Sequence, residues 1–481
     1  MSFSDPDLSR GSAQVIRDAL HGTIRLHDHE VVVIDHPLFQ RLRFICQNDI
    51  LGLVFPGATH SRFIHSIGAM HVADRMFSQL VHAHLIDAPA ALPPAVMAAL
   101  VYLNRCLRLA MLLHDSGHGS FSHQMEYTPE VAAMMRAPGR FERLWAGVEV
   151  GDLYPEAPRV LHHEHYSVRA AARILESCAA ARGAPDARDV LSLMETTTPA
   201  LSARFREAAA VAWPVFAGPG AALVGDAPAL LAGLLRAIVS GELDADKADY
   251  ILRDATNCSV SYGQINLDAL INALRCGWIP EENWLGLVIQ AKGVPNFEDF
   301  VHSRHQLYRH IYNHKTSVGF DLLLRRAIGE LMEEPAVGAA MDRFLADIDA
   351  FADLTDTYFW ERFREHAARD PESAAARIVR RRKLRHLGTH VDLPGFRVHD
   401  ERRELAERLG VGESAIVHCV NAVRFSRISE GFADIKVQTR DPVDGTRAYR
   451  SLSETSDFFA KFKDLTLTHF YLDRPATSAE A

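Results

Sequence analysis

The sequence predicts a mainly α-helical protein with a small α+β lobe at its C-terminal end, and two observations carry this prediction. Apolar residues recur at helical spacing through most of residues 46–332. After about Glu333 the pattern changes to a helix-rich linker and then to short β-prone runs, IKVQTR (435–440) and TRAYRSL (446–452). The DPVDG sequence between these runs (441–445) is typical of a hairpin turn.

Five segments carry the clearest helical periodicity, and weaker signals lie between them. Residues 14–45 predict a short strand or turn followed by a helix that begins near Pro37. Residues 179–228, which are rich in Ala, Gly and Pro, predict a partly helical insertion with a mobile loop. The five helical segments are His65–Leu85, Val96–Asp115, Ser167–Cys178, Leu230–Val239 and Asp246–Arg253.

These patterns divide the chain of 481 residues into four parts. We expect a flexible N-terminus at 1–13, a helical core at 14–332 that includes the insertion 179–228, an α+β lobe at 333–475 and a tail at 476–481. The length is large for a single domain, so one large core with an appended lobe is the expected arrangement.

Composition excludes several classes of protein. Hydrophobic residues make up 48% of the chain and charged residues 23%, which is typical of a globular protein. The net charge of -9 argues against a nonspecific nucleic-acid binder. Six cysteines without C-x-x-C spacing indicate neither a zinc ribbon nor a disulfide framework. The N-terminus lacks a signal-peptide pattern and no apolar run approaches membrane-spanning length, so we expect a cytoplasmic protein without a membrane partner.

Three separated clusters of His and Asp residues are the main functional signal. His65 lies in THSRFIHS, His114 and Asp115 in LLHDSGHGSFSH, and Asp246 in LDADKADYILRD. Two imidazoles and two carboxylates suit a divalent cation such as Mn, Fe, Zn or Mg. A lone His on an apolar helix is more often a hydrogen-bonded core residue, but an ionised Asp beside it is costly to bury without a cation or donors.

The order of four motifs resembles the HD-domain deoxynucleoside triphosphate (dNTP) triphosphohydrolases, and especially bacterial homologues of the animal sterile-alpha-motif and HD-domain dNTPase. The motifs are R-x-x-H (62–65), HD-x-G-H-G-x-F-S-H (114–123), HHE (162–164) and D-K-x-D-Y-x-x-R-D (246–254). The resemblance covers roughly residues 14 to 330. It implies an HD phosphohydrolase core that splits a dNTP into a deoxynucleoside and inorganic triphosphate with a bound divalent metal, held by His65, His114, Asp115 and Asp246.

The same resemblance assigns roles to residues around the metal. His123 matches the histidine that protonates the leaving oxygen, a role suited to a group that titrates near neutrality. Glu126 stands where the family orients that histidine with Asp. His118 and His163 match histidines that contact the α-phosphate, and Glu164 is an expected orienting carboxylate.

The resemblance also predicts the substrate pocket. Cationic residues would grip the triphosphate, aromatic and polar residues would enclose the deoxyribose, and two departures from the animal enzyme, Tyr308 and Asn48, lie near the base. The predicted substrate-binding residues are Arg62, Gln47, Lys247, Tyr250, Asp254, Arg304, Tyr308 and Tyr312.

A possible nucleotide-activator site is suggested by Asp35, Gln40 and Arg43, which in the family promote assembly into a tetramer. We therefore expect a homo-oligomer, tetrameric or larger. An equally simple interpretation is a structural ion pair between Asp35 and Arg43. The basic run 380–386 fits an effector-phosphate or nucleic-acid site, although a solvated helix face is the commonest outcome for such runs.

Three functional classes follow from these motifs. The leading one is a dNTP triphosphohydrolase that acts in nucleotide-pool control or phage defence. The second is an HD phosphohydrolase that acts on nucleoside monophosphates or on a modified or signalling nucleotide. The third is a nucleic-acid-binding regulator whose HD site is vestigial. The intact metal ligands argue against this third class.

Overall fold

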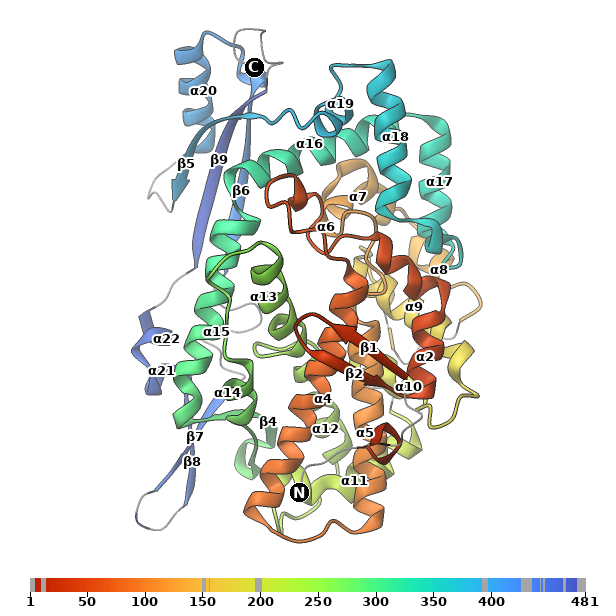
Figure 1. Cartoon of the computed structure of the whole chain (residues 1–481), viewed down its shortest axis with the longest axis vertical. Helices are drawn as coiled ribbons and strands as arrows, with labels where there is room; N and C mark the ends of the chain where they lie inside the picture. Colours follow the sequence, from red (N-terminus) through yellow and green to blue (C-terminus); the bar gives the residue numbers. More distant parts are fainter. Residues whose placement is uncertain are drawn as a thin grey trace.

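The computed structural model describes residues 5–9, 14–148, 153–154, 156–194, 201–391, 397–424, 435–441, 443, 446–461 and 464–473. Helices dominate residues 5–332, as Figure 1 shows. Those helices are α1 (Pro6–Ser9), α2 (Asp28–Asp35), α3 (Pro37–Gln40), α4 (Arg62–Asp87), α5 (Pro94–Leu113), α6 (His123–Tyr127), α7 (Pro129–Met135), α8 (Arg140–Leu144), α9 (His163–Cys178), α10 (Ala187–Met194), α11 (Ala203–Ala217), α12 (Ala227–Val239), α13 (Ala245–Asn257), α14 (Leu267–Asn272), α15 (Val294–Leu307) and α16 (Lys315–Met332).

The C-terminal part adds helices and most of the strands. Its helices are α17 (Pro335–Ala346), α18 (Asp356–Arg369), α19 (Ala374–Val379), α20 (Val398–Leu409), α21 (Leu452–Thr455) and α22 (Asp457–Lys461). The strands of the described chain are β1 (Gln14–Asp18), β2 (Gly22–Leu26), β3 (Leu274–Ile279), β4 (Trp284–Gln290), β5 (Arg385–Val391), β6 (Ile416–Val423), β7 (Lys436–Arg440), β8 (Arg447–Ser451) and β9 (Leu465–Leu472).

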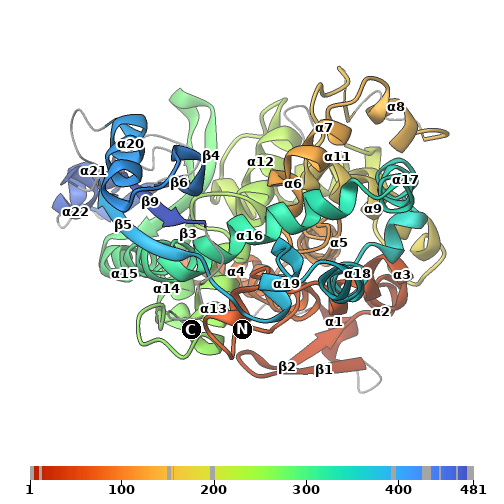
Figure 2. The same ribbon diagram turned by 90° about the horizontal axis from the view of Figure 1, so that it is seen from above.

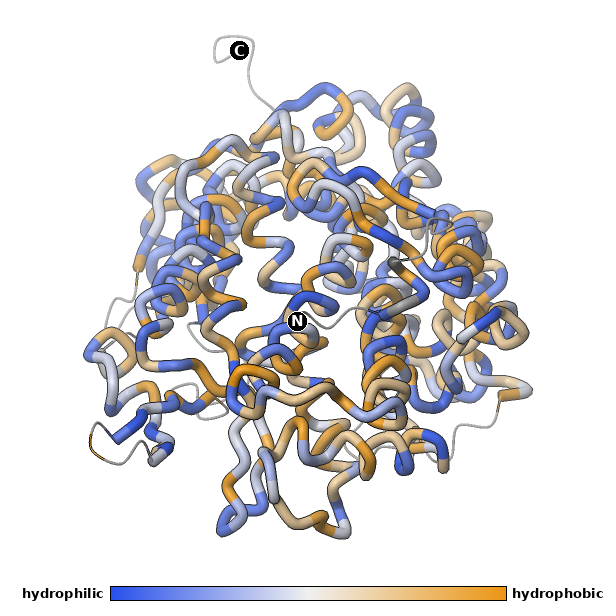
Figure 3. The backbone as a smooth tube through the Cα atoms, turned by 60° about the horizontal axis from the view of Figure 1, so that its bottom comes forward, coloured by the Kyte–Doolittle hydropathy of each residue, from blue (hydrophilic) through white to orange (hydrophobic). Residues whose placement is uncertain are grey.

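Helices α4 and α5 run side by side through the centre of the molecule, with α13 packed on α4 (Figures 1 and 2). Helix α5 begins at Pro94, where the missing N–H of proline costs nothing, and from Ala99 onward nearly every residue is buried. Apolar and polar residues alternate along most other helices, as Figure 3 shows, because those helices bury only one face. Helix α5 thus lies within the core of the fold.

Three small sheets complete the fold. Strands β1 and β2 form an antiparallel hairpin, and β5, β9 and β6 form an antiparallel sheet in that order. The third sheet has the order β3-β4-β7-β8, and its parallel pair β4–β7 joins residues 288–290 to residues 436–438. The C-terminal strands therefore extend a sheet that begins within the predicted core.

The predicted fold class, mainly helical with a small α+β lobe, is confirmed. A helix lies over each of the five predicted segments, and the hairpin expected around residues 441–445 is the antiparallel pair β7–β8. Its turn residues 442, 444 and 445 lie outside the described residues. Strands β3 and β4 were not predicted, because their short apolar runs lie between strongly helical segments.

The ends of the chain and one basic surface segment differ in part from the predictions. Within the predicted flexible N-terminus, residues 6–9 form α1 and the Asp5 carboxylate accepts hydrogen bonds from Arg105. The other predicted segments lie partly or wholly outside the described chain: residues 1–4 and 10–13, residues 195–200 of the insertion, and the tail 476–481. The basic run 380–386 is largely exposed but is not a helix face: α19 ends at Val379, and the run forms a turn that leads into β5.

Helix α5 is long and apolar enough to cross a membrane by length and composition, although Asn104, Arg105 and Arg108 interrupt its apolar residues. Its most apolar stretch is 78% buried within the described structure, as in the core helix of many folded domains.

Candidate active site

The four predicted metal ligands meet at one point of the core. His65 lies in the first turn of α4, His114 and Asp115 directly follow α5, and Asp246 lies in the first turn of α13. The His65 Nε2 atom is 3.1 Å from Asp246 Oδ1 and 3.6 Å from Asp115 Oδ2. The His114 Nε2 atom is 3.3 Å from Asp115 Oδ1 and 3.7 Å from Asp246 Oδ1. The structure thus brings all four side chains together.

The donor atoms of this set fit a divalent cation. The Nδ1 atoms of both histidines are engaged, that of His65 with Asp249 at 2.8 Å and that of His114 with the Met111 carbonyl at 2.7 Å. Among the described residues, the buried Nε2 atoms of both have no hydrogen-bond partner. Two imidazoles with free Nε2 atoms and two carboxylates are a ligand set for Mn, Fe, Zn or Mg, and they do not distinguish among these ions.

The charges of the set depend on one another. Burial opposes a charge on His65, but the nearby carboxylates of Asp246 and Asp249 outweigh it and raise the pKa of His65 to about 10. Burial likewise opposes a charge on Asp115, yet Arg62 and the neighbouring histidines hold its pKa well below the usual range. Without a cation, therefore, a proton on His65 helps to balance the buried carboxylates.

The loop after His114 is held in a backbone conformation that needs its particular residues. A Cβ atom at Gly117 would lie 1.9 Å from the backbone nitrogen of Ser167 on α9, so only glycine allows this close approach. Phe121 and Ser122 adopt positive φ angles of 53° and 52°, which are rare for such residues. The Arg41 guanidinium donates to the Ser116 carbonyl at 2.8 Å and also to that of His118. This geometry places His118 and His123 beside the metal ligands.

Three histidines form a second cluster next to the metal set. The rings of His118 and His163 stack with centroids 3.9 Å apart, and the His123 ring stands nearly perpendicular to both at 4.9 Å. We expected the Glu126 carboxylate to orient His123, but the structure places it beside another histidine. It lies 3.0 Å from Nδ1 of His163. Glu164 is also near that atom, at 3.3 Å, as expected for an orienting carboxylate.

The charge state of His123 also differs from the sequence-based expectation. Burial, the neighbouring His163 and the Arg62 guanidinium lower the pKa of His123 to about 3. The imidazole is therefore neutral at neutral pH when no anion is bound, whereas we expected a group titrating near neutrality. A bound polyphosphate would favour the protonated form, because an opposite charge nearby raises the pKa of a histidine.

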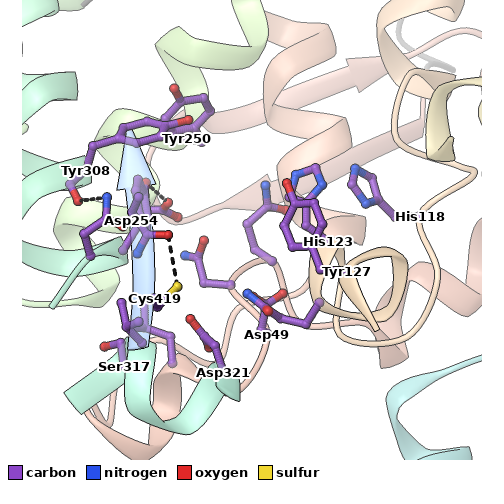
Figure 4. A pocket seen from close by; sticks show the side chains of 18 of the residues that line it. Asp49, His118, His123, Tyr127, Tyr250, Asp254, Tyr308, Ser317, Asp321 and Cys419 are labelled. Carbon is purple, nitrogen blue, oxygen red and sulfur yellow. Dashed lines mark hydrogen bonds between the residues drawn. The ribbon is translucent and has the colours of Figure 1, made fainter. Parts of the chain in front are cut away.

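A cavity of about 710 Å³ opens onto this cluster, and Figure 4 shows part of its wall. Asp115 and Asp246 line it together with all three clustered histidines, so the metal set has access to the cavity. Of the predicted substrate-binding residues, all but one line it: Arg62, Gln47, Tyr250, Asp254, Arg304, Tyr308 and Tyr312.

Lys247 is the predicted residue that the structure places elsewhere. Its ammonium group is buried and donates to the Asp244 carboxylate and to the Gly241 carbonyl at 2.6 Å. Asp244 is also the N-cap of α13, where its side chain accepts from the Lys247 backbone N–H. A buried ammonium needs such partners, and the loop before α13 supplies them, so Lys247 is not among the residues that line the cavity.

The wall beyond the metal set carries an aromatic and acidic group. Tyr250 and Asp254 lie one turn apart on α13, and the Tyr312 hydroxyl donates to Asp254. His60 holds the other Asp254 oxygen at 2.8 Å, and Arg304 donates to the Tyr250 hydroxyl at 3.2 Å. Residues 308–312 form a single π-helical turn, a feature that often marks functional sites.

The candidate activator residues lie outside this cavity. Asp35 is exposed, and the Arg43 guanidinium donates to the Gln40 side chain at 2.7 Å and stacks 3.5 Å over the Phe63 ring. The alternative ion pair is wrong, because within the described chain Asp35 and Arg43 make no ion pair with each other.

Sequence reasoning missed several residues of the site. Asp249 accepts from His65, His21 and Arg253, and its place in the D-K-x-D-Y motif was an available signal. The remaining missed residues line the cavity from distant segments and have no common motif: Asp49, Gln124, Tyr127, Asn313, Ser317, Asp321, Arg325, Cys419 and Asn421.

Comparison with known proteins agrees with this geometry. The chain is 29% identical over 359 residues to the human deoxynucleoside triphosphate triphosphohydrolase SAMHD1, which covers 72% of this chain and 50% of the human protein. It is 25% identical over 468 residues to the zebrafish (Danio rerio) SAMHD1, covering 92% of this chain and 66% of that protein. An uncharacterised protein of Methanocaldococcus jannaschii is 25% identical over 357 residues, covering 73% and 57%. No protein-family model matches the chain.

Solved structures share the fold. A phosphohydrolase from Bacteroides thetaiotaomicron superposes with a TM-score of 0.63 at 20% identity, covering 96% of this chain and all of its own. A hypothetical protein from Aquifex aeolicus gives 0.60 at 22% identity, covering 96% and 97%. The chain spans about half the length of the human SAMHD1 that it matches.

The His, His-Asp and Asp set at the ends of central helices has the arrangement that the motifs predicted, and the fold is shared with the solved phosphohydrolase structure. The resemblance to the dNTP triphosphohydrolases that the motifs predicted is confirmed by similarity over most of the chain.

Proposed function

We propose that this protein is a metal-dependent dNTP triphosphohydrolase that releases a deoxynucleoside and inorganic triphosphate. The observation that carries the proposal is the opening of the four-residue metal set onto a cavity of about 710 Å³, whose wall also holds the histidine cluster and the Tyr250–Asp254 group. Sequence similarity to proteins named dNTP triphosphohydrolases supports the choice of substrate. In this proposal the biological role is control of the dNTP pool or defence against phage.

Each part of the cavity has a role in the proposed reaction. A divalent metal held by His65, His114, Asp115 and Asp246 would supply positive charge for a phosphate oxygen and a water molecule. His118 and His163 face the same space and are suited to donate hydrogen bonds to the α-phosphate. His123 would protonate the 5′-oxygen as the bond to phosphorus breaks.

The deoxyribose would lie along the wall formed by α13 and the π-helical turn. The Asp254 carboxylate is an acceptor for the 3′-hydroxyl, and the Tyr250 ring would leave no room for a 2′-hydroxyl. Arg304 and Arg62 supply positive charge to a polyphosphate in a chain whose net charge is negative. Lys247 would take part only if it leaves its present partners.

Regulation and assembly belong to the same proposal. The exposed Asp35 and Arg43, with the half-buried Gln40 that Arg43 contacts, would hold an activating nucleotide, and its binding would favour an assembled homo-oligomer through its higher affinity for that state. The cytoplasmic location stays a prediction from the sequence.

The test is a product assay on the metal-reconstituted protein with each dNTP, singly and in mixtures, followed by chromatography. We expect tripolyphosphate and the deoxynucleoside from the wild type, and neither product nor bound metal with Asp246→Ala. Orthophosphate released from nucleoside monophosphates, with no turnover of any dNTP, would favour the second class of HD phosphohydrolase instead. Full turnover by the Asp246→Ala protein would contradict the proposed metal site.

A further inference from the structure

Helix α18 lies beyond the end of the predicted HD core, yet its first residue contacts the loop that leads to His123. The Asp356 carboxylate is buried, with only 4% of the residue exposed. Its Oδ1 atom accepts a hydrogen bond from the Phe121 backbone N–H at 2.7 Å, and its Oδ2 atom accepts one from the Cys46 backbone N–H at 2.9 Å. One buried side chain therefore joins three segments that are far apart in the sequence.

The turn that Asp356 contacts has a backbone conformation that most side chains avoid. Phe121 and Ser122 both have positive φ angles, 53° and 52°, immediately before His123. Such a conformation persists only where the surrounding contacts fix it. The orientation of His123 therefore depends on what holds this turn.

The Phe121 side chain is held by the same helix. Its ring is fully buried, and its centroid lies 5.9–6.0 Å from those of three aromatic rings on α18. These rings belong to Phe359, Trp360 and Phe363. Helix α18 thus fixes both the backbone N–H and the ring of Phe121.

The next residue links this turn to the cavity. The Ser122 hydroxyl accepts a hydrogen bond from Arg62 Nε at 2.8 Å and donates one to the Cys46 carbonyl at 2.9 Å. Arg62 and His123 both line the cavity. A shift of the turn would therefore move two groups that the proposed reaction uses.

The ionised form of Asp356 is kept in the fold at a cost. Burial raises the pKa of Asp356 to about 6, although the N–H groups of Cys46 and Phe121 favour the charged form. Because this pKa is higher than that of an Asp in an unfolded chain, stability falls as the carboxyl group ionises between about pH 4 and pH 6. A buried charge that lowers stability beside a cavity is typical of a functional site.

We propose that Asp356 is a positioning residue for the histidine cluster, which fixes the turn before His123 and so holds the His123 ring toward the bound dNTP. The kinetic consequence of this inference rests on the proposed function, whereas the orientation of the ring does not. Two carboxylate oxygens match two N–H donors. An amide cannot match both, because one of its ends is itself a donor.

The first experiment measures turnover by the metal-reconstituted Asp356→Asn protein at about pH 8, where the native carboxyl group is ionised. We expect kcat to fall about 10²-fold with no loss of bound metal, since a misplacement of about 1 Å costs a catalytic group that much. KM should change less, because Tyr250, Asp254 and Arg304 line the cavity from other elements.

Two control variants separate positioning from a general loss of stability. Asp189→Asn on α10 is the matched control, because this fully buried carboxylate also accepts from a backbone N–H, that of Ser202 at 2.7 Å, and does not line the cavity in the described structure. It should lower the Tm and leave kcat unchanged. Asp268→Asn, whose side chain is 80% exposed on α14, should change neither quantity.

The second measurement requires no turnover. NMR of zinc-loaded protein labelled with ¹⁵N at histidine reports the position of the His123 ring, which stands 4.9 Å from the rings of His118 and His163. The spectrum of His123→Ala identifies its signals. We expect these signals to shift in Asp356→Asn and in neither control. Asp356→Glu, which moves the same two oxygens, should cause the same two changes and replaces Asp356→Asn if that variant does not fold.

Wild-type kcat or unshifted His123 signals in a folded Asp356 variant would overturn the inference. A loss of kcat that the Asp189 variant shares, or one that follows a loss of metal, also overturns it. If the wild type hydrolyses no dNTP, the proposed function fails, and the His123 signals alone then decide whether Asp356 positions this ring.

Discussion

The Asp249 carboxylate is expected to control metal affinity although it is not a ligand. It lies 2.8 Å from Nδ1 of His65 and is fully buried, and the two hydrogen bonds from Arg253 fix its position. A Cβ atom at Gly68 on α4 would lie 2.2 Å from its Oδ1, so only glycine at that position leaves room for the Asp249 carboxylate. A carboxylate so placed orients the imidazole and makes its Nε2 a stronger donor to a metal.

Replacing Asp249 by Asn keeps the shape but removes the charge. We expect metal affinity to fall about 10- to 100-fold, which corresponds to about 1.4–2.7 kcal/mol. The fold should survive with a lower Tm, because Arg253 keeps its ion pair with Asp18 at 3.0 Å and so is not left unpaired. Metal titration followed by calorimetry, at a temperature where circular dichroism shows the variant folded, measures the loss; Asp268→Asn is the control. A folded variant with wild-type affinity would refute this account of Asp249.

Three further predictions concern the proposed chemistry and its regulation. His123→Ala should retain the metal and lose about 10²–10⁴-fold in turnover, because it removes a proton donor and not a ligand; loss of metal measured by elemental analysis would show instead that His123 is a ligand. Tyr250→Ala should narrow the ratio of dNTP to NTP turnover, and an unchanged ratio would place sugar discrimination elsewhere. Arg43→Ala should abolish the stimulation of one dNTP's turnover by a second nucleotide and leave metal content unchanged; kinetics that no second nucleotide affects, identical in both proteins, would contradict the activator site.

The metal set could be predicted from the sequence because its members lie in short motifs. His114 and Asp115 follow a long apolar helix and are followed by glycines, and Asp246 begins a helical segment rich in charged residues. The five helical segments were equally visible, since each carries several turns of apolar periodicity. The order of the motifs then linked His65 to His114, Asp115 and Asp246, although these residues are far apart in the sequence.

The rest of the cavity wall could not be predicted in the same way. Asp49, Asp321 and Asn421 lie in a loop, a helix and a C-terminal strand, and only the packing of these elements brings them together. The partner of Glu126 was mistaken for the same reason, because the start of α9 brings His163 closer than His123. The position of the Lys247 ammonium group could not be predicted either, because the sequence does not show that it donates a hydrogen bond to Asp244.

The bond that is broken tests the central claim most directly. Hydrolysis of a dNTP in ¹⁸O-labelled water by the metal-reconstituted protein should form a bond between water oxygen and the α-phosphorus, break the bond to the 5′-oxygen and leave the proton on that oxygen. The account predicts tripolyphosphate carrying one ¹⁸O atom and an unlabelled deoxynucleoside, seen by mass spectrometry. Orthophosphate with a deoxynucleoside diphosphate, or pyrophosphate with a deoxynucleoside monophosphate, would contradict it.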